Sequence, residues 1–150
     1  MQYKDASLTL GGGKADEEFG SSCDTTSASL DGTAPKILEG GFAVESEPDV
    51  SVDPCGRRGS EPEVIFSPSA GLAFRSTGQQ DGRSCNAVMK GGKAAELTDP
   101  IPFSKLRVGQ KFCNTHPYDS QERVELLRVQ DISAKGRKVT FTVTAWEQNE

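Results

Sequence analysis

The sequence contains a single histidine, His116, among its 150 residues, and this scarcity removes several classes of enzyme. A zinc protease of the HExxH type needs two histidines, so that chemistry is excluded. A serine hydrolase would need His116 as general base beside an activated serine, but no G-x-S-x-G nucleophile turn occurs. His116 precedes Pro117 in a polar segment, where an exposed loop histidine is the ordinary interpretation. The sequence therefore predicts no catalytic residue.

Long hydrophobic runs and basic stretches are also missing. No segment approaches the ~20 apolar residues that cross a bilayer, so the sequence predicts no membrane span. No basic stripe is interleaved with aromatic residues, and the net charge is −5, which argues against nucleic acid as a partner. No basic and apolar leader precedes Tyr3. If the chain is exported, we therefore expect that its leader or anchor has been removed and that Met1 is an added initiator.

Cysteines are few, and none of the four lies close to another. Structural zinc usually takes ligands from pairs two to four residues apart, and a redox motif reads CxxC, so neither is expected. The acidic segments lack EF-hand spacing, and we predict no metal and no cofactor. An even number of separated cysteines instead indicates two structural disulfides, formed in an oxidising compartment outside a cell membrane. The four residues are Cys23, Cys55, Cys85 and Cys113.

Four cysteines allow three pairings, of which we expect Cys23–Cys55 and Cys85–Cys113. Each of these bonds would tie an irregular stretch to a more regular neighbour. The core itself is expected to be weak, because only 34% of residues are hydrophobic and the chain has 16 glycines and 8 prolines. In the chain-entropy model, each of the two loops that these disulfides would close contributes about 3.6 kcal/mol of stability. Their sum is comparable with the net stability of a small domain.

The hydrophobic pattern that is present indicates strands. Residues 3–10 alternate apolar and polar side chains, as a half-buried strand does, and the glycines at 11–13 end it. Residues 14–64 are acidic and rich in Ser, Thr, Gly and Pro, so we expect an irregular region there. One short helix is expected from Ser84, which can cap it, to the glycines at 91–92. Short apolar islands that are candidate strands lie at residues 37–38, 42–44, 50–52, 64–66 and 71–74.

The C-terminal third has the clearest pattern. Residues 111–113 follow a Val-Gly turn, and residues 123–129 form a strand whose doubled leucine suggests burial on both faces or a bulge. Residues 139–146 alternate almost without error and join that strand in an antiparallel hairpin through the loop 133–136. The spacing of strands and turns along residues 1–150 predicts a single mainly β domain. We expect an antiparallel β-sandwich or a partly open barrel with one short helix.

Three segments of the C-terminal third also share a pattern with a known group of domains. They read L-x-V-G-x-x-F-C from Leu106, R-V-x-L-L-R-V from Arg123 and V-T-F-x-V-T-x-W from Val139. These segments resemble an uncharacterised β-rich domain of secreted, lipid-anchored and kinase-linked proteins of actinobacteria. The resemblance implies an extracytoplasmic, disulfide-bonded β module, and it brings no catalytic residue with it.

Residues 114–122 depart from that resemblance, because a short acidic-Gly-Arg turn is expected there. We predict that this longer segment is the protein's own contact loop, with His116 and Tyr118 as contact residues. Trp146 is a third candidate, since aromatic residues dominate binding hot spots. It lies on the threonine side of its strand, so it is a contact if that side is exposed and core if it is covered. Because tryptophan is usually largely buried in folded proteins, the core position is favoured for Trp146.

These observations predict a non-enzymatic extracytoplasmic binding or accessory module. Its partner would be a protein or a cell-envelope ligand, recognised through residues 114–122. Two alternatives remain from the sequence. One is a secreted hydrolase or hydrolase inhibitor acting through the same loop, and the other is a structural spacer outside a membrane anchor.

Overall fold

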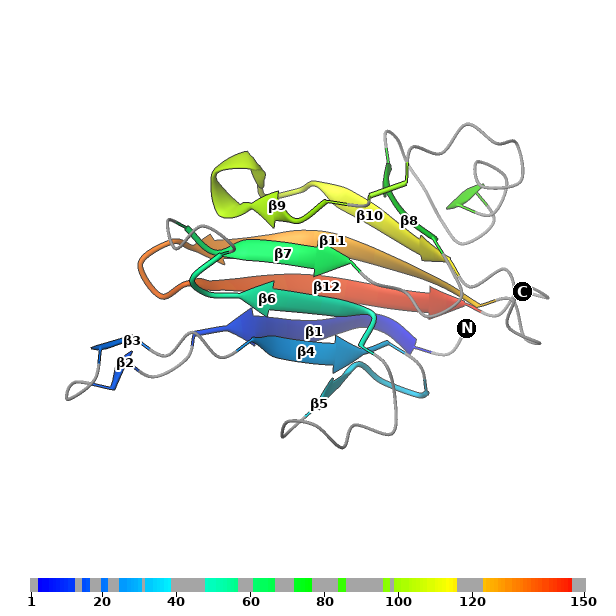
Figure 1. The fold of residues 1–150 in the computed structure, drawn as a ribbon. Coiled ribbons are helices and arrows are strands. Elements are labelled where there is room, and N and C mark those ends of the chain that lie inside the picture. The colour runs from blue at the N-terminus through cyan, green and yellow to red at the C-terminus, as the bar shows by residue number, and fades with distance from the viewer. Residues whose placement is uncertain are drawn as a thin grey trace.

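The chain forms a mainly β structure, as predicted, in which two five-stranded antiparallel sheets lie in two layers (Figure 1). The first sheet has the order β1 (Tyr3–Gly11), β12 (Lys138–Trp146), β11 (Val124–Ser133), β10 (Lys111–Thr115) and β8 (Leu72–Ser76). The second has the order β5 (Lys36–Leu38), β4 (Thr26–Ser29), β6 (Val50–Asp53), β7 (Glu63–Phe66) and β9 (Ile101–Pro102). Separate from both are the ribbon of β2 (Ala15–Asp16) and β3 (Gly20–Ser21) and the 3-10 helix η1 (Phe103–Lys105).

The structure is a computed structural model, and it describes twelve stretches of the chain. These are residues 3–12, 15–16, 20–21, 25–30, 32–38, 48–56, 61–66, 72–76, 84–85, 96–97, 99–115 and 123–146.

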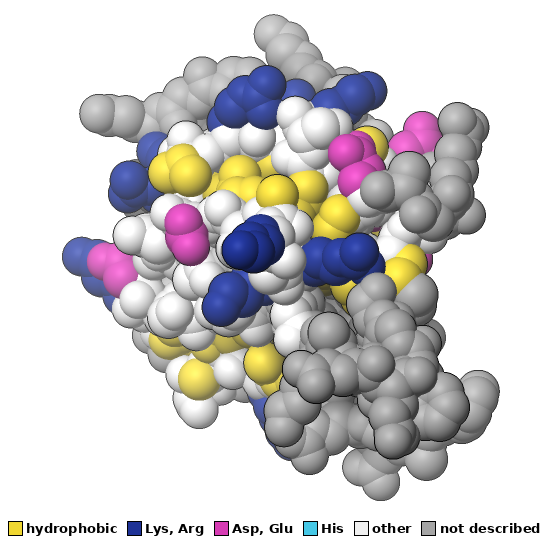
Figure 2. Space-filling model, turned by 90° about the vertical axis from the view of Figure 1, so that its left-hand side faces the viewer, with side chains coloured by type: hydrophobic (Ala, Val, Ile, Leu, Met, Phe, Trp, Pro, Cys, Tyr) yellow, Lys and Arg dark blue, Asp and Glu magenta, His cyan; other side chains and the backbone are white. Residues whose placement is uncertain are grey.

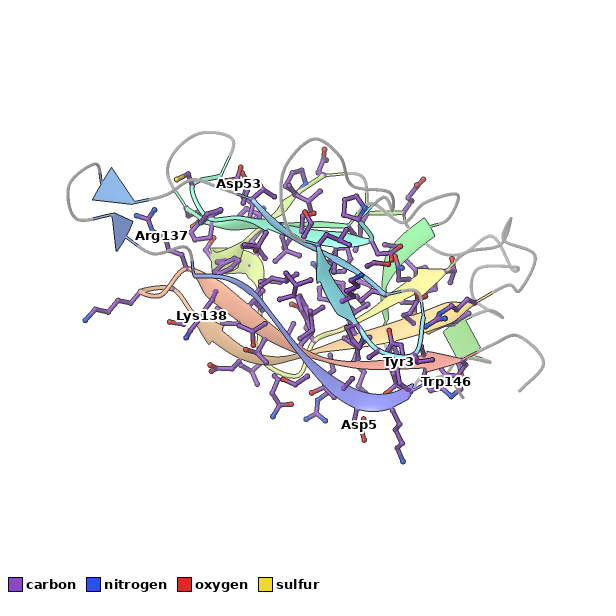
Figure 3. All side chains as sticks on the ribbon, turned by 90° about the horizontal axis from the view of Figure 1, so that it is seen from below. Tyr3, Asp5, Asp53, Arg137, Lys138 and Trp146 are labelled. Carbon is purple, nitrogen blue, oxygen red and sulfur yellow. A yellow bond between two sulfur atoms is a disulfide. The ribbon has the colours of Figure 1, made fainter. Side chains whose placement is uncertain are left out.

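One hydrophobic core lies between the two sheets. Side chains of both layers fill the space between the sheets (Figure 3). The core includes Leu10 and Phe141 from the first sheet and Val52 from the second. Two aromatic rings join the layers, since the ring centroids of Phe66 and Phe112 lie 4.9 Å apart. The core therefore depends on both sheets together.

The hairpin of β11 and β12 confirms the prediction from alternation. Leu127 pairs with Val143 and Val129 with Phe141, and all four side chains are buried in the core. Leu126, the other half of the doubled leucine, packs on the opposite face of the sheet. Burial on both faces therefore explains the doublet, and the register shift of this strand pair lies farther along, between residues 129 and 131.

The expectation of an irregular region over residues 14–64 was wrong for β4, whose sequence Thr-Ser-Ala-Ser carries no large apolar residue. This strand is central in its sheet, between β5 and β6. Ala28 is its core residue, and the hydroxyl of Ser27 hydrogen-bonds that of Ser51 at 2.8 Å. Thr26 Oγ1 accepts the backbone N–H of Gly11 at 2.6 Å. Hydroxyl pairing and a small inward side chain thus replace the hydrophobic pattern that usually marks a strand.

The disulfide Cys85–Cys113 is confirmed, with a Cα–Cα distance of 6.0 Å. Cys55 is disulfide-bonded as well, but Cys23, the partner expected for it, lies outside the described residues, so that pairing stays a prediction. Ser84 and Cys85 have helical backbone, and the rest of the expected helix lies outside the described residues. The candidate strand at 42–44 lies outside them too.

Candidate functional site

The predicted contact loop leaves the first sheet between β10 and β11. His116 and Tyr118 lie outside the described residues, and of the predicted loop 114–122 only Asn114 and Thr115 are described. The prediction was wrong for these two, because they are fully buried strand residues of β10 and cannot contact a partner. Thr115 pairs with Val124 at the loop's base, and Val124 pairs in turn with Trp146 on β12. Trp146 is half-buried, so it is neither a full core residue nor a freely exposed one. The structure therefore places the third predicted contact residue on the strand next to the loop base, paired with Val124.

The outer face of the sheet is apolar beneath this base. Buried or partly buried side chains from β8, β10 and β11 pack there against Cys85, and the Cys85–Cys113 bond crosses this cluster. The outer cluster consists of Phe74, Cys85, Cys113, Val124 and Leu126. It anchors the last residues of β10 and the first of β11 from the outside.

The inner face of the sheet turns polar at the same end. Along β11 the inward positions are Val129, Leu127 and Glu125, because alternate residues of a strand share a face. Glu125 pairs with Asn114 on β10, and both residues are fully buried. Charged and amide side chains of this kind are rarely buried without partners, so this end of the core is built around a polar group of residues.

Arg123 is the centre of that group and is the residue that directly follows the contact loop. Only 6% of its surface is exposed. Its Nη2 donates hydrogen bonds to the carbonyl of Leu30, at 2.8 Å, and to that of Gly32. Its Nε lies 3.8 Å from Glu125 Oε1. The guanidinium therefore ties the end of the contact loop to the segment that follows β4 in the opposite sheet.

Tyr3 closes the group from the edge strand β1. Its ring lies under the Arg123 guanidinium, 5.6 Å from Arg123 Cζ to the ring centroid, and its hydroxyl donates to the carbonyl of Leu30 at 2.8 Å. Burial raises the pKa of Tyr3, and the negative charge of Glu125 raises it further, while the Arg123 charge opposes both. Tyr3 is therefore a neutral hydrogen-bond donor at physiological pH.

Asp49 brings a carboxylate from the second sheet. It is fully buried, and its Oδ2 accepts the backbone N–H of Leu30 at 2.7 Å. Since Tyr3 and Arg123 bind the carbonyl of Leu30, side chains hold both polar backbone groups of this residue. We name Tyr3, Asp49, Asn114, Arg123 and Glu125 the polar end cluster.

The polar end cluster connects two sheets and the base of one loop through charged hydrogen bonds. Such contacts suit a rigid support better than a reaction centre, because the donors are already engaged with backbone carbonyls. Over the described stretches of chain, no group of three or more His, Cys, Asp or Glu side chains is arranged to hold a metal ion. No helix in those stretches is long and apolar enough to cross a membrane.

Sequence reasoning missed the polar end cluster. No sequence pattern singled out Arg123 or Glu125, which lie on either side of Val124 in the predicted strand. The inward position of Glu125 could have been predicted, because it lies two residues before Leu127 and four before Val129, and alternate residues of a strand share a face. For Arg123 and Asp49 no local pattern existed, because their partner, Leu30, is remote in sequence from both.

Comparisons with protein-family models, curated proteins and solved structures gave no match.

Proposed function

We propose that this protein is a non-enzymatic extracytoplasmic binding module whose contact surface is the part of the predicted loop 114–122 that follows β10, residues 116–122, flanked by Trp146. The observation that carries the proposal is that the fold holds the base of that loop in a fixed position. Arg123, at its end, is locked into the opposite sheet through the carbonyls of Leu30 and Gly32. A loop presented from fixed ends loses less conformational entropy when it binds a partner.

Three independent contacts support the same base. The ladder of β10 and β11 reaches the pair Thr115 and Val124, the Cys85–Cys113 bond fixes β10 from the outer face, and Arg123 fixes the loop's end from the inner face. A spacer has no need of such support at one loop. This favours the binding module over a spacer.

We further propose that the two sheets form a β-sandwich and that the protein functions outside the cytoplasm. Two antiparallel five-stranded sheets with a common core support a β-sandwich rather than a partly open barrel. The Cys85–Cys113 disulfide supports an oxidising, extracytoplasmic compartment.

The test compares loop variants in capture of cell-envelope material by immobilised protein. We expect the double variant His116→Ala/Tyr118→Ala to lose the material that the native protein captures, and Trp146→Ala to weaken its capture. The matched control is Arg128→Ala, an exposed residue within β11 that belongs to neither loop. Capture that is identical for native protein and the double variant would contradict the contact-loop proposal. Turnover of an envelope substrate that His116→Ala abolishes would show a hydrolase instead.

A further inference from the structure

The end of the molecule opposite the contact loop gathers positive charge. Figure 2 looks onto this end and shows Lys and Arg side chains across it, with hydrophobic side chains exposed between them. Two loops supply the described cations: η1 with the turn that follows it, and the hairpin loop between β11 and β12. Lys105, Arg107, Lys135 and Lys138 are all exposed. With Val108 they form what we name the basic end.

Val108 is the most exposed large hydrophobic residue among those described, at 63%. Its turn is held rigidly, since the N–H of Gln110 donates to the carbonyl of Arg107 and Gly109 N–H to that of Val129. The φ of +92° at Gly109 makes this turn possible. The Arg107 Nη1 donates to the carbonyls of Ser104 and Leu106, which fixes its charge beside Val108. An apolar side chain is thus displayed in water beside a fixed cation.

The second loop is equally defined. The N–H of Gly136 donates to Ser133 Oγ at 3.0 Å, and the carbonyl of Arg137 accepts the N–H of Gly12 at 3.0 Å. Figure 3 shows Arg137 and Lys138 at this end and Tyr3 and Trp146 at the other. The basic end is therefore a preformed surface, separate from the contact loop.

The acidic groups near these loops do not cancel this charge at the surface. Asp53 Oδ1 accepts the backbone N–H groups of Cys55 and Gly56, and Glu61 Oε1 accepts the hydroxyl of Ser104. Glu63 is buried, and only Asp131 is exposed among the described acids of β6, β7 and β11 at this end. Asp53 and Glu61 are partly buried, so Asp131 is the one exposed carboxylate of these four beside the exposed cations.

We propose that the basic end docks onto the surface of an anionic phospholipid bilayer. Lysine and arginine near such a surface are attracted by its negative potential, and an exposed valine beside them can enter the headgroup region. A soluble acidic polymer would use the cations but would gain nothing from Val108. Because the whole chain carries a net charge of −5, the attraction depends on orientation, and only this end faces the lipid.

The test is cosedimentation of the whole chain with vesicles of phosphatidylcholine, with and without phosphatidylglycerol, at low and physiological ionic strength. We expect binding only to the anionic vesicles, weakened by salt. Lys105→Glu/Lys135→Glu should weaken it roughly tenfold or more, and Val108→Ser by about tenfold. All three residues are exposed, so unchanged melting temperatures should show that the variants fold.

The matched control is Lys4→Glu/Lys36→Glu, the same charge change on two exposed lysines at the contact-loop end, which should bind as the native protein does. Absence of binding to anionic vesicles, or an equal loss in both double variants, would overturn the proposal. So would binding of polyphosphate that is as tight as that of vesicles and insensitive to Val108→Ser, which would indicate an acidic polymer. None of these results bears on capture through residues 116–122.

Discussion

At the scale of single residues, Arg123 explains most of the arrangement around the contact loop. It is a buried cation whose charge is balanced by Glu125 and by two backbone carbonyls. Buried ion pairs are costly to form, but removal of one partner leaves the other charge in a medium of low polarity. The residue is therefore more sensitive to substitution than its place beside a polar loop indicates.

We expect Arg123→Ala to lower the free energy of unfolding by about 3–5 kcal/mol, because Glu125 would then keep its buried charge without the guanidinium. Urea denaturation followed by tryptophan fluorescence measures this change through Trp146. The control is Arg128→Ala on the exposed side of β11, which should change stability by no more than about 0.5 kcal/mol. A loss below about 1 kcal/mol for Arg123→Ala would show that the cluster is not structural.

Tyr3 makes the stability of the fold depend on pH in the alkaline range. Its pKa is raised in the folded state, mainly by burial, above the ordinary value of about 10 that it has in the unfolded chain. Its contribution to stability is therefore complete below pH ~10 and is lost as the pH rises beyond that value, because the unfolded state releases the proton more readily. Tyr3→Phe should remove this pH dependence, although it also loses the hydrogen bond to Leu30.

Tyrosinate absorbance tests the raised pKa directly. The chain has two tyrosines, so in Tyr118→Phe only Tyr3 contributes. We expect its ionisation to lag behind that of free tyrosine and to appear together with unfolding. Titration of Tyr3 near pH 10 in the folded variant would contradict the assignment.

At the scale of elements, the sequence was informative where burial was periodic. β11 and β12 could be predicted because each turns alternate apolar residues into one core. β4 could not, because Ala28 is its only core side chain and the hydroxyl groups of Thr26 and Ser27 make other side-chain contacts of the strand. The polar end cluster stayed hidden for a related reason: Arg123 meets Leu30 only after the two sheets have packed.

The junction between the end of β1 and the β11–β12 loop offers a test of element packing. A Cβ on Gly11 would lie 2.2 Å from the carbonyl oxygen of Arg137, and its φ is +91°. We expect Gly11→Ala to destabilise the fold by more than the roughly 1–2 kcal/mol of backbone strain alone. Gly109→Ala is the matched control, since its φ is +92° and no atom lies within 4 Å of the added carbon. Equal losses in thermal unfolding would contradict the close approach.

At the scale of the whole molecule, one covalent bond joins segments that the sheets alone do not connect. Cys85 and Cys113 are 28 residues apart, and the bond joins the helical residues 84–85 to β10 of the first sheet. Its closed loop restricts the unfolded chain, which matters for a sequence with few hydrophobic residues.

We expect Cys85→Ala/Cys113→Ala to lose about 2–5 kcal/mol of stability, measured by urea denaturation in the absence of reductant. Non-reducing peptide mapping of the native chain should recover Cys85 linked to Cys113. A peptide that links Cys23 to Cys113 would contradict both the pairing and the predicted Cys23–Cys55 bond.

β11 connects the two proposed surfaces. It is ten residues long and runs from Val124, beside the contact loop, to Ser133, where the basic hairpin loop begins. At about 3.3 Å per residue this strand measures roughly 30 Å. Under both proposals, a partner captured by the loop would stand off from the lipid headgroups by at least that length, several times the Debye length of about 8 Å at physiological salt. The membrane's charge would then not reach the partner, and even an acidic partner could be held there without repulsion.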